Sequence, residues 1–320
     1  MMTNNNTQNH IVHSELFTIR DWIRFAVSQF EASDIFYGHG TDNAYDEAVW
    51  LIMSGLHLPM DTLNNFLDAR LIPAERNKLA EFIDQRISKH TPTAYLLKEA
   101  WLQGLKFYVD ERVLIPRSFI AELLANDLST GDLSPWIEFP EMIQSAADIC
   151  TGSGCLGILL ASVFPNAAID VIDISQDAID VANINIANYG LQEQVTAIKS
   201  DMFSALKGPD NKPKLYDVII SNPPYVDAPS MAALPQEYQN EPQLALGSGI
   251  AGLDHTHTIL REAANYLNDD GILIVEIGHN RDALEAAYPN MIFNWLEVSS
   301  GNEFVFLLTK SQLTLGHTTL

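Results

Sequence analysis

The sequence has few of the residues that build disulfide-stabilised or membrane proteins. It contains two cysteines in 320 residues, Cys150 and Cys155, which is typical of reduced thiols in a cytoplasmic protein. No apolar run is long enough to cross a bilayer. The polar start, residues 1–6, lacks the basic and apolar regions of a signal peptide. These observations predict a cytoplasmic globular protein with no membrane partner.

Positive charge is also scarce. The formal net charge is −23, and neither Lys nor Arg occurs in residues 118–198 or 215–260, although Asp and Glu continue through both. Proteins that bind nucleic acid through its phosphates usually carry a basic patch, so nucleic-acid binding is not expected. An acidic surface attracts basic partners. An acidic, soluble surface with no particular partner explains the charge equally well.

The pattern of apolar residues divides the chain into three parts. The first part is residues 1–91, of which residues 1–13 are expected to be disordered. From Ser14 apolar residues recur at three- and four-residue spacing, with Thr18 as a helix cap, which predicts a small helical bundle suited to docking. Residues 92–117 alternate around Gly104 and predict a β-hairpin linker. Ser118 then opens a helix over 119–125, and residues 118–320 are expected to form the remaining domain.

The third part alternates strands with helices from residue 146 onward. Such alternation predicts an α/β fold with a mostly parallel seven-stranded sheet covered on both faces, and ligands at the carboxyl ends of its strands. The last two strands share only a short glycine-bearing link, so they should form an antiparallel hairpin at the sheet edge. Strands are expected at 146–150, 168–172, 194–199, 216–220, 271–276, 291–296 and 303–308, and helices at 155–163, 175–188, 255–267 and 281–287.

The first chemistry-bearing stretch is a glycine loop between the first strand of the sheet and the next helix. Glycines there let the backbone approach a ligand, and the following helix start offers free N–H groups. The loop lacks the glycine spacing of a full dinucleotide fingerprint, so by itself it is a weak signal. Its residues are Asp148, Cys150, Thr151, Gly152, Ser153 and Gly154.

Acidic residues follow the next two strands. Asp173 ends the second strand, 19 residues after Gly154, where a carboxylate can accept hydrogen bonds from both hydroxyls of a ribose. It could equally cap the helix that starts at Ser175. Asp201 follows the third strand and could accept a hydrogen bond from an adenine amine, with Met202 or Phe203 against the ring. The alternative is a plain helix cap beside a core aromatic.

The tetrapeptide Asn222, Pro223, Pro224 and Tyr225 follows the buried run Val218-Ile219-Ile220. Two prolines donate no backbone hydrogen bonds and favour an extended chain, so this loop should be stiff, with free carbonyls. A simple strand-terminating turn is an equally good interpretation of these four residues alone. All four stretches, however, fall just past strand ends of one sheet. Together they predict an adenosine pocket beside a rigid polar and aromatic loop.

These residues resemble a known family. The glycine loop, Asp173, the Asp201-Met202-Phe203 stretch and the Asn-Pro-Pro-Tyr loop are similar to those of class I S-adenosylmethionine-dependent methyltransferases with a Rossmann-like fold. Residues 108–117 resemble the HemK-type protein-glutamine methyltransferases. Residues 116–123 resemble the branch that modifies a ribosomal protein, although Phe119 stands where that branch often has proline. Residues 38–47, 234–238 and 241–242 resemble the same branch.

The resemblance implies methyl transfer to a glutamine amide of the basic large-subunit ribosomal protein L-three. It assigns the methionine end of S-adenosylmethionine to residues 150–154, the ribose to Asp173, and the adenine to Asp201 with Met202. Asn222 and the carbonyl of Pro223 would accept the two N–H groups of the target amide, and Tyr225 would pack nearby. No metal is expected, because the nine histidines are scattered along the chain.

Two other activities compete with this one. The family also includes methyltransferases of peptide release factors, whose motif usually continues Pro-Arg with Pro-x-Thr-Glu. A nucleic-acid adenine methyltransferase would use a similar Pro-Pro-aromatic loop on an exocyclic amine. The absence of a basic groove from the sequence disfavours it. A non-catalytic assembly factor is a further alternative, which the intact tetrapeptide disfavours.

Overall fold

The computed structural model describes residues 15–126 and 131–317. Residues 1–14, at the start of the expected helical domain, lie outside this description. The chain forms two compact units. The helical unit comprises the described residues up to Glu99 together with Pro235–Asn240, and the sheet unit comprises the remainder. No helix in the described parts of the chain is both long and apolar enough to cross a membrane.

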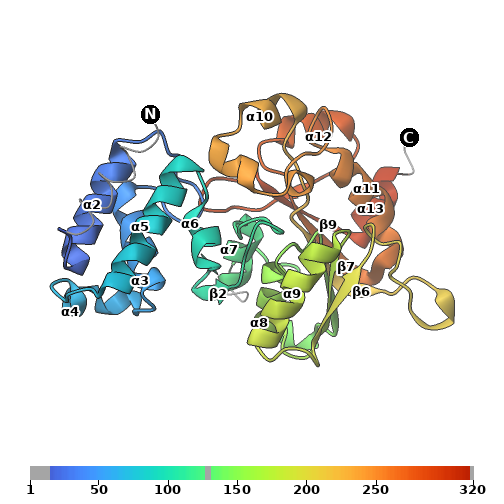
Figure 1. Ribbon diagram of the computed structural model, residues 1–320. Helices are drawn as coiled ribbons and strands as arrows, with labels where there is room; N and C mark the ends of the chain where they lie inside the picture. Colours follow the sequence, from blue (N-terminus) through green and yellow to red (C-terminus); the bar gives the residue numbers. More distant parts are fainter. Residues whose placement is uncertain (1–14, 127–130, 318–320) are drawn as a thin grey trace. The chain divides into compact units, whose positions relative to one another are not determined.

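The helical unit is organised around α2 and α3 (Figure 1). Apolar side chains on one stripe of α2, such as Trp22, Ala26 and Phe30, are buried against α3 and α5. The expected cap, Thr18, accepts a hydrogen bond from Asp21 N, and the Asp21 carboxylate accepts one from Thr18 N. The elements are α2 (Ile19–Glu31), α3 (Ala44–Gly55), η1 (Met60–Thr62), α4 (Leu63–Phe66), α5 (Pro73–Ser88), α6 (Thr93–Leu97) and η4 (Gln236–Asn240).

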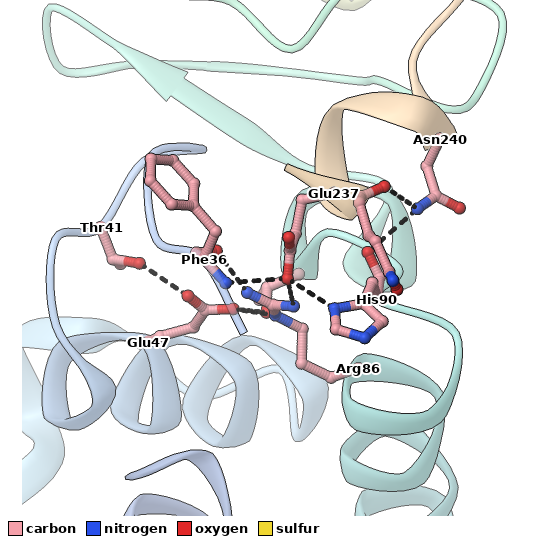
Figure 2. A network of polar contacts seen from close by, with 9 residues as sticks. Phe36, Thr41, Glu47, Arg86, His90, Glu237 and Asn240 are labelled. Carbon is pink, nitrogen blue, oxygen red and sulfur yellow. Dashed lines mark hydrogen bonds and ion pairs between the residues drawn. The ribbon is translucent and has the colours of Figure 1, made fainter. Parts of the chain in front are cut away.

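A buried polar network lies inside the helical unit (Figure 2). Arg86 is 1% exposed, and its guanidinium donates to Glu47 Oε1, to Glu237 Oε1 at 2.9 Å and to Phe36 O at 2.8 Å. Glu237 Oε1 also accepts from Phe36 N at 2.9 Å and contacts His90 Nδ1 at 3.0 Å. Burial raises the pKa of Glu237, but these bonds outweigh it and hold that pKa below its usual value. Because Glu237 lies in η4, the network fixes this distant segment of the chain to the helices.

The sheet unit contains the expected seven-stranded sheet, in the order β5-β4-β3-β6-β7-β9-β8. The first five strands in this order are parallel, and β9 is antiparallel to both β7 and β8. The antiparallel pair at the edge is therefore confirmed. The strands are β3 (Ser145–Ile149), β4 (Ala168–Asp173), β5 (Val195–Lys199), β6 (Tyr216–Ser221), β7 (Leu267–Glu276), β8 (Asn294–Trp295) and β9 (Val305–Thr309).

Helices cover both faces of this sheet (Figure 1). Alternate strand residues point to opposite faces, so Val218 and Ile220 pack with one layer while Ile219 packs with the other. The first layer is α7 (Phe119–Ala125), α8 (Cys155–Val163) and α9 (Gln176–Asn188); the second includes α11 (Asp254–Ala263), α12 (Arg281–Ala287) and α13 (Lys310–His317). The remaining short elements are η2 (Pro140–Met142), η3 (Pro209–Asn211), α10 (Ala228–Ala233), η5 (Gln243–Ala245) and η6 (Ala264–Tyr266).

The structure corrects several expected element boundaries. The expected strand 291–296 is only Asn294–Trp295, because the buried side chain of Met291 packs in the core outside any strand. The helix expected over 255–267 ends at Ala263, continues as one 3₁₀ turn, and gives Leu267 to β7. In the linker, the hairpin is limited to β1 (Ala100–Leu102) and β2 (Leu105–Phe107).

We predict that Arg86→Met strongly destabilises the helical unit. The change leaves two buried carboxylates without their shared cation, which typically costs about 3–5 kcal/mol. The free energy of unfolding in urea measures the loss. Arg20→Met is the matched control, because the Arg20–Asp68 ion pair is exposed, and its stability should stay near that of the wild type. Equal stability of the two variants would contradict the prediction.

Candidate active site

The carboxyl ends of β3, β4, β5 and β6 bring the predicted residues together. In the ladder, Ile149 of β3 pairs with Ile172 of β4 and with Ser221 of β6. The residues that follow these three are Cys150, Asp173 and Asn222. They therefore lie at the same level of the sheet. The strand order also reverses here, since β4 and β6 flank β3, and ligands of open α/β sheets bind at such a reversal.

A cavity opens at this edge, within the sheet unit. Nine predicted residues line it: Cys150, Thr151, Gly152, Ser153, Asp173, Asp201, Met202, Asn222 and Pro224. Four others do not line it, namely Asp148, Gly154, Pro223 and Tyr225. The rest of the lining includes residues 112–114 and 116–118, Pro242, Leu244, Ala245 and His255. The four stretches found in the sequence thus contribute to one cavity.

Asp148 holds the glycine loop through buried hydrogen bonds. Its side chain is fully buried, and Oδ2 accepts hydrogen bonds from Thr151 Oγ1 and from Gly157 N at 3.1 Å. Gly157 is required because a Cβ there would collide with Val171 of β4, so α8 starts close against the sheet. Burial raises the pKa of Asp148 to about 7. Among the described residues, its Oδ1 atom is buried without a hydrogen-bond partner.

Asn185 fixes the other side of the glycine loop. It is fully buried on α9, and its amide donates to Ser153 O at 2.9 Å and to Tyr108 O at 3.0 Å. Its Oδ1 accepts from Tyr108 N at 2.7 Å. The side-chain amide of Asn185 thus bonds to both Ser153 and Tyr108. These bonds hold the glycine loop against the segment that follows the β1–β2 hairpin. Nothing in the local sequence distinguishes Asn185 from the other polar residues of its helix.

Asp173 lies beside Ser175, the N-cap residue of α9, and its side chain has two hydrogen-bond partners. Oδ1 accepts from Ser175 N at 2.9 Å, next to the cap of α9, and Oδ2 accepts from Gly152 N at 3.0 Å. The residue also lines the cavity. Burial raises its pKa above the usual value. Because an ionised carboxylate has about four acceptor positions, these two bonds leave capacity for a ligand.

The stretch after β5 divides its residues between cavity and core. Asp201 is exposed and lines the cavity, and Met202 lines it beside Cys150, with their sulfur atoms 4.0 Å apart. Phe203 is fully buried and stacks on Tyr266 with ring centroids 4.7 Å apart. Met202 is therefore the apolar side chain available to a ligand, and Phe203 is a core aromatic.

The Asn-Pro-Pro-Tyr loop is held at both ends. Asn222 Nδ2 donates to Arg117 O at 3.3 Å, which turns its Oδ1 away from Arg117. The Tyr225 hydroxyl donates to Glu276 Oε1 at 3.4 Å, and Tyr225 O accepts from Asn280 Nδ2 at 2.8 Å. Burial raises the pKa of Glu276 to about 7. The loop is rigid through these contacts as well as through its two prolines.

Glu241 anchors the segment that faces this loop. Its carboxylate is buried, accepts from Ile115 N at 3.0 Å, and forms two bonds with the Arg117 guanidinium at 2.8 and 2.6 Å. Such bidentate pairs fix direction as well as position. The sequence resemblance included Glu241 without giving it a role, and only the fold brings it to Ile115 and Arg117.

The charged groups leave the cavity acidic. Its two arginines are each paired with a carboxylate, Arg117 with Glu241 and Arg112 with Asp110 at 2.7 Å. Asp173 and Asp201 line the same cavity. The surroundings of this edge therefore favour a cationic ligand. Burial raises the pKa of Cys150, which favours the neutral thiol.

His255 also lines the cavity, although no sequence pattern singled it out. Its Nδ1 lies 2.8 Å from Ser248 Oγ, and burial lowers its pKa, which favours the neutral ring. In the described parts of the chain, no group of three or more His, Cys, Asp or Glu side chains is arranged to hold a metal ion.

We predict that Asp148→Asn changes the pH dependence of stability. The carboxyl of the unfolded chain ionises near its ordinary pKa of 3.8, whereas the folded one keeps its proton up to a pKa of about 7. The wild type should therefore lose stability relative to Asp148→Asn as pH rises toward 7, by on the order of 3 kcal/mol, with no further change above pH 7. Urea unfolding between pH 5 and pH 8 measures this; parallel curves would contradict it.

Comparisons with known proteins show the family of the chain. Residues 133–237 match the family model of the methyltransferase small domain. A ribosomal protein uL3 glutamine methyltransferase of Neisseria gonorrhoeae is 55% identical over 299 residues, covering 93% of this chain and 96% of that protein. The protein of the same name from Bordetella pertussis is 49% identical over 312 residues, covering 98% and 99%.

A solved methyltransferase structure from Pyrococcus furiosus aligns at a TM-score of 0.44 and 16% identity, covering 65% of this chain and 89% of that one. The two sequence relatives match nearly the whole chain, and they confirm the resemblance seen in its motifs. The chain belongs to the ribosomal protein uL3 glutamine methyltransferase family.

Proposed function

We propose that the protein transfers a methyl group from S-adenosylmethionine to the side-chain amide nitrogen of a glutamine in ribosomal protein uL3, the protein L-three of the large subunit. The main support is that Asn222 and Pro224 line the same cavity as Asp173 and Asp201. A methyl donor and a planar amide can therefore meet in one cavity. The protein substrate follows from the names of the relatives, and a ribosomal substrate implies a cytoplasmic reaction.

The residues of the cavity fit S-adenosylmethionine. This cofactor supplies a methyl group activated by a positively charged sulfonium. Asp173 and Asp201 offer negative charge at the cavity, and both arginines are already neutralised by carboxylates. A cationic ligand with several donors suits this set of side chains.

Each part of the cofactor has a candidate partner. The loop from Cys150 to Gly154 would hold the methionine end. Asp173 would accept the ribose hydroxyls with the acceptor positions that Gly152 N and Ser175 N leave over. Asp201 would accept from the adenine amine while Met202 lies against the ring. Asn222 directly follows β6 and lies at the same level of the sheet as Asp173. It would therefore border the cofactor as well as the target amide.

The Asn-Pro-Pro-Tyr loop would receive the target amide. An amide nitrogen is a poor nucleophile because its lone pair is delocalised into the carbonyl. Asn222 Oδ1, turned away from Arg117, and the carbonyl of Pro223 would accept the two N–H bonds and fix the amide plane. These acceptors raise the electron density on nitrogen and aim it at the methyl group. Orientation and a preset electrostatic environment supply most of such an acceleration.

The reaction needs no strong general base. The nitrogen loses its proton readily once it carries the new methyl group, so the loop needs acceptors and not a His or Lys. This agrees with a tetrapeptide that has no titratable side chain apart from Tyr225. Water must be kept from the reacting atoms, and the consecutive prolines and Tyr225 would serve that purpose.

The helical unit would dock the protein substrate. Ribosomal proteins are generally basic, and a chain of net charge −23 attracts a basic partner and speeds its encounter at low salt. The same charge disfavours binding of nucleic acid, so a basic protein is a better substrate candidate than RNA.

We predict that Asn222→Ala abolishes methyl transfer while the cofactor still binds. Loss of one preset hydrogen-bonding group typically slows catalysis about 100-fold or more. Transfer of label from the cofactor to unmethylated uL3 measures the rate, and calorimetry should give a cofactor Kd within several-fold of the wild type. Asn268→Ala, at the opposite end of the sheet, is the control. Full turnover by Asn222→Ala would refute the assigned role.

We predict that Asp173→Ala weakens cofactor binding by about tenfold or more, since it removes a charge and two acceptors at the proposed ribose position. Asp173→Asn keeps the shape and one acceptor and should give an intermediate Kd. Calorimetric titration with S-adenosylmethionine gives both values. Asp180→Ala, on the exposed face of α9, should bind like the wild type. Unchanged affinity in Asp173→Ala would reject the assignment.

A further inference from the structure

Glu276, the last residue of β7, joins two segments of the site. It is 2% exposed, and Oε2 accepts from Ser118 Oγ at 2.6 Å and from Phe119 N at 2.9 Å. Its other oxygen, Oε1, accepts from the Tyr225 hydroxyl at 3.4 Å, the long end of a hydrogen bond. One carboxylate therefore contacts both the start of α7 and the Asn-Pro-Pro-Tyr loop.

The residues after Glu276 hold the rest of Tyr225. Asn280 Nδ2 donates to Tyr225 O at 2.8 Å. Gly278 has a φ of +56°, and a Cβ there would stand 2.8 Å from ring carbons of Tyr225. Only glycine fits this close approach without strain. The segment from Glu276 to Asn280 thus contacts the hydroxyl, the ring and the carbonyl of Tyr225, and it fixes the direction of the side chain.

Glu276 also acts on the other end of the tetrapeptide. Ser118 and Phe119 directly follow Arg117, whose carbonyl accepts the hydrogen bond that orients Asn222. By fixing Ser118 and the Phe119 N–H, the carboxylate fixes the backbone on which the Asn222 amide depends. Both polar ends of the loop are therefore tied to one buried group.

A purely structural role, as a cap of α7, explains Glu276 less well. Ser118 already caps this helix, because its Oγ accepts from Ile120 N at 3.1 Å. The hydrogen-bonding neighbours of Glu276, which are Ser118, Phe119 and Tyr225, are all donors, which is the arrangement that suits the ionised form.

We infer that Glu276 is a positioning residue for methyl transfer, which sets the direction of Tyr225 beside the target amide through the Tyr225 hydroxyl. This inference rests on the proposed function of the loop. It assigns Glu276 to the amide side of the reaction, so removing one of its two acceptor oxygens should change turnover and leave cofactor binding intact.

The test is a double-mutant cycle of Glu276→Gln and Tyr225→Phe. Gln keeps the size of Glu276 and can still accept from Ser118 or Phe119, but it cannot accept on both sides. Each single variant should lower kcat roughly tenfold, within the range of coupled residues. The cofactor Kd should stay within about twofold, and the double variant should be no slower than the slower single variant.

Several outcomes would overturn the inference. Unchanged kcat in Glu276→Gln would do so, as would losses that multiply in the double variant, because Glu276 would then act independently of Tyr225. Glu122→Gln is the control, a carboxylate of α7 that accepts from Ser299 N and lies outside the cavity; its kcat should match the wild type. If Glu276→Gln does not fold, the cycle is repeated with Glu276→Asp, which keeps the charge and shortens the reach.

The wild-type reaction separates this inference from the proposed function. If wild-type protein transfers no label to uL3, the proposed function fails. If the wild type is active and the cycle shows no coupling, the proposed function stands and only the role of Glu276 is lost.

Discussion

The parallel pairing of β3 with β4 on one side and with β6 on the other is the constraint on which the site depends. It places Cys150, Asp173 and Asn222 at one level of the sheet. Loops that leave two flanking strands in opposite directions leave space between them. The pairing is stabilised by buried β-branched residues on both faces, and mispairing by one residue would turn these side chains toward the wrong layer. The chemistry thus depends on the register of a hydrophobic core.

Buried polar side chains then make each loop rigid. Asp148 and Asn185 hold the glycine loop, Glu241 holds the segment around Arg117, and Glu276 holds Tyr225. Burial raises the pKa of Asp148 and Glu276, so ionising either group would cost stability. Sites commonly depart in this way from the most stable arrangement, because a preset geometry lowers the reorganisation that the reaction would otherwise require.

Local patterns predicted the parts of the structure that depend on neighbours in sequence. Alternating apolar runs predicted the sheet, and caps such as Thr18 and Ser118 predicted helix starts. The supporting residues could not be found this way, because Asn185 and Glu276 lie 77 and 158 positions from the partners they hold, Tyr108 and Ser118. The expected strand 291–296 was too long for a related reason. Its apolar residues satisfy core packing that only the folded chain defines.

The short segment Pro235–Asn240 gives the chain an interlaced topology. It belongs to the helical unit, although the residues on both sides of it belong to the sheet unit. The backbone consequently passes between the units three times, and no single cleavage point separates them. A fragment starting at Ala100 would retain Glu237 but lose Arg86, its cation. The two units are therefore not interchangeable modules: a recombination that exchanged the helices up to Glu99 would have to bring a matching segment for Pro235–Asn240 with them.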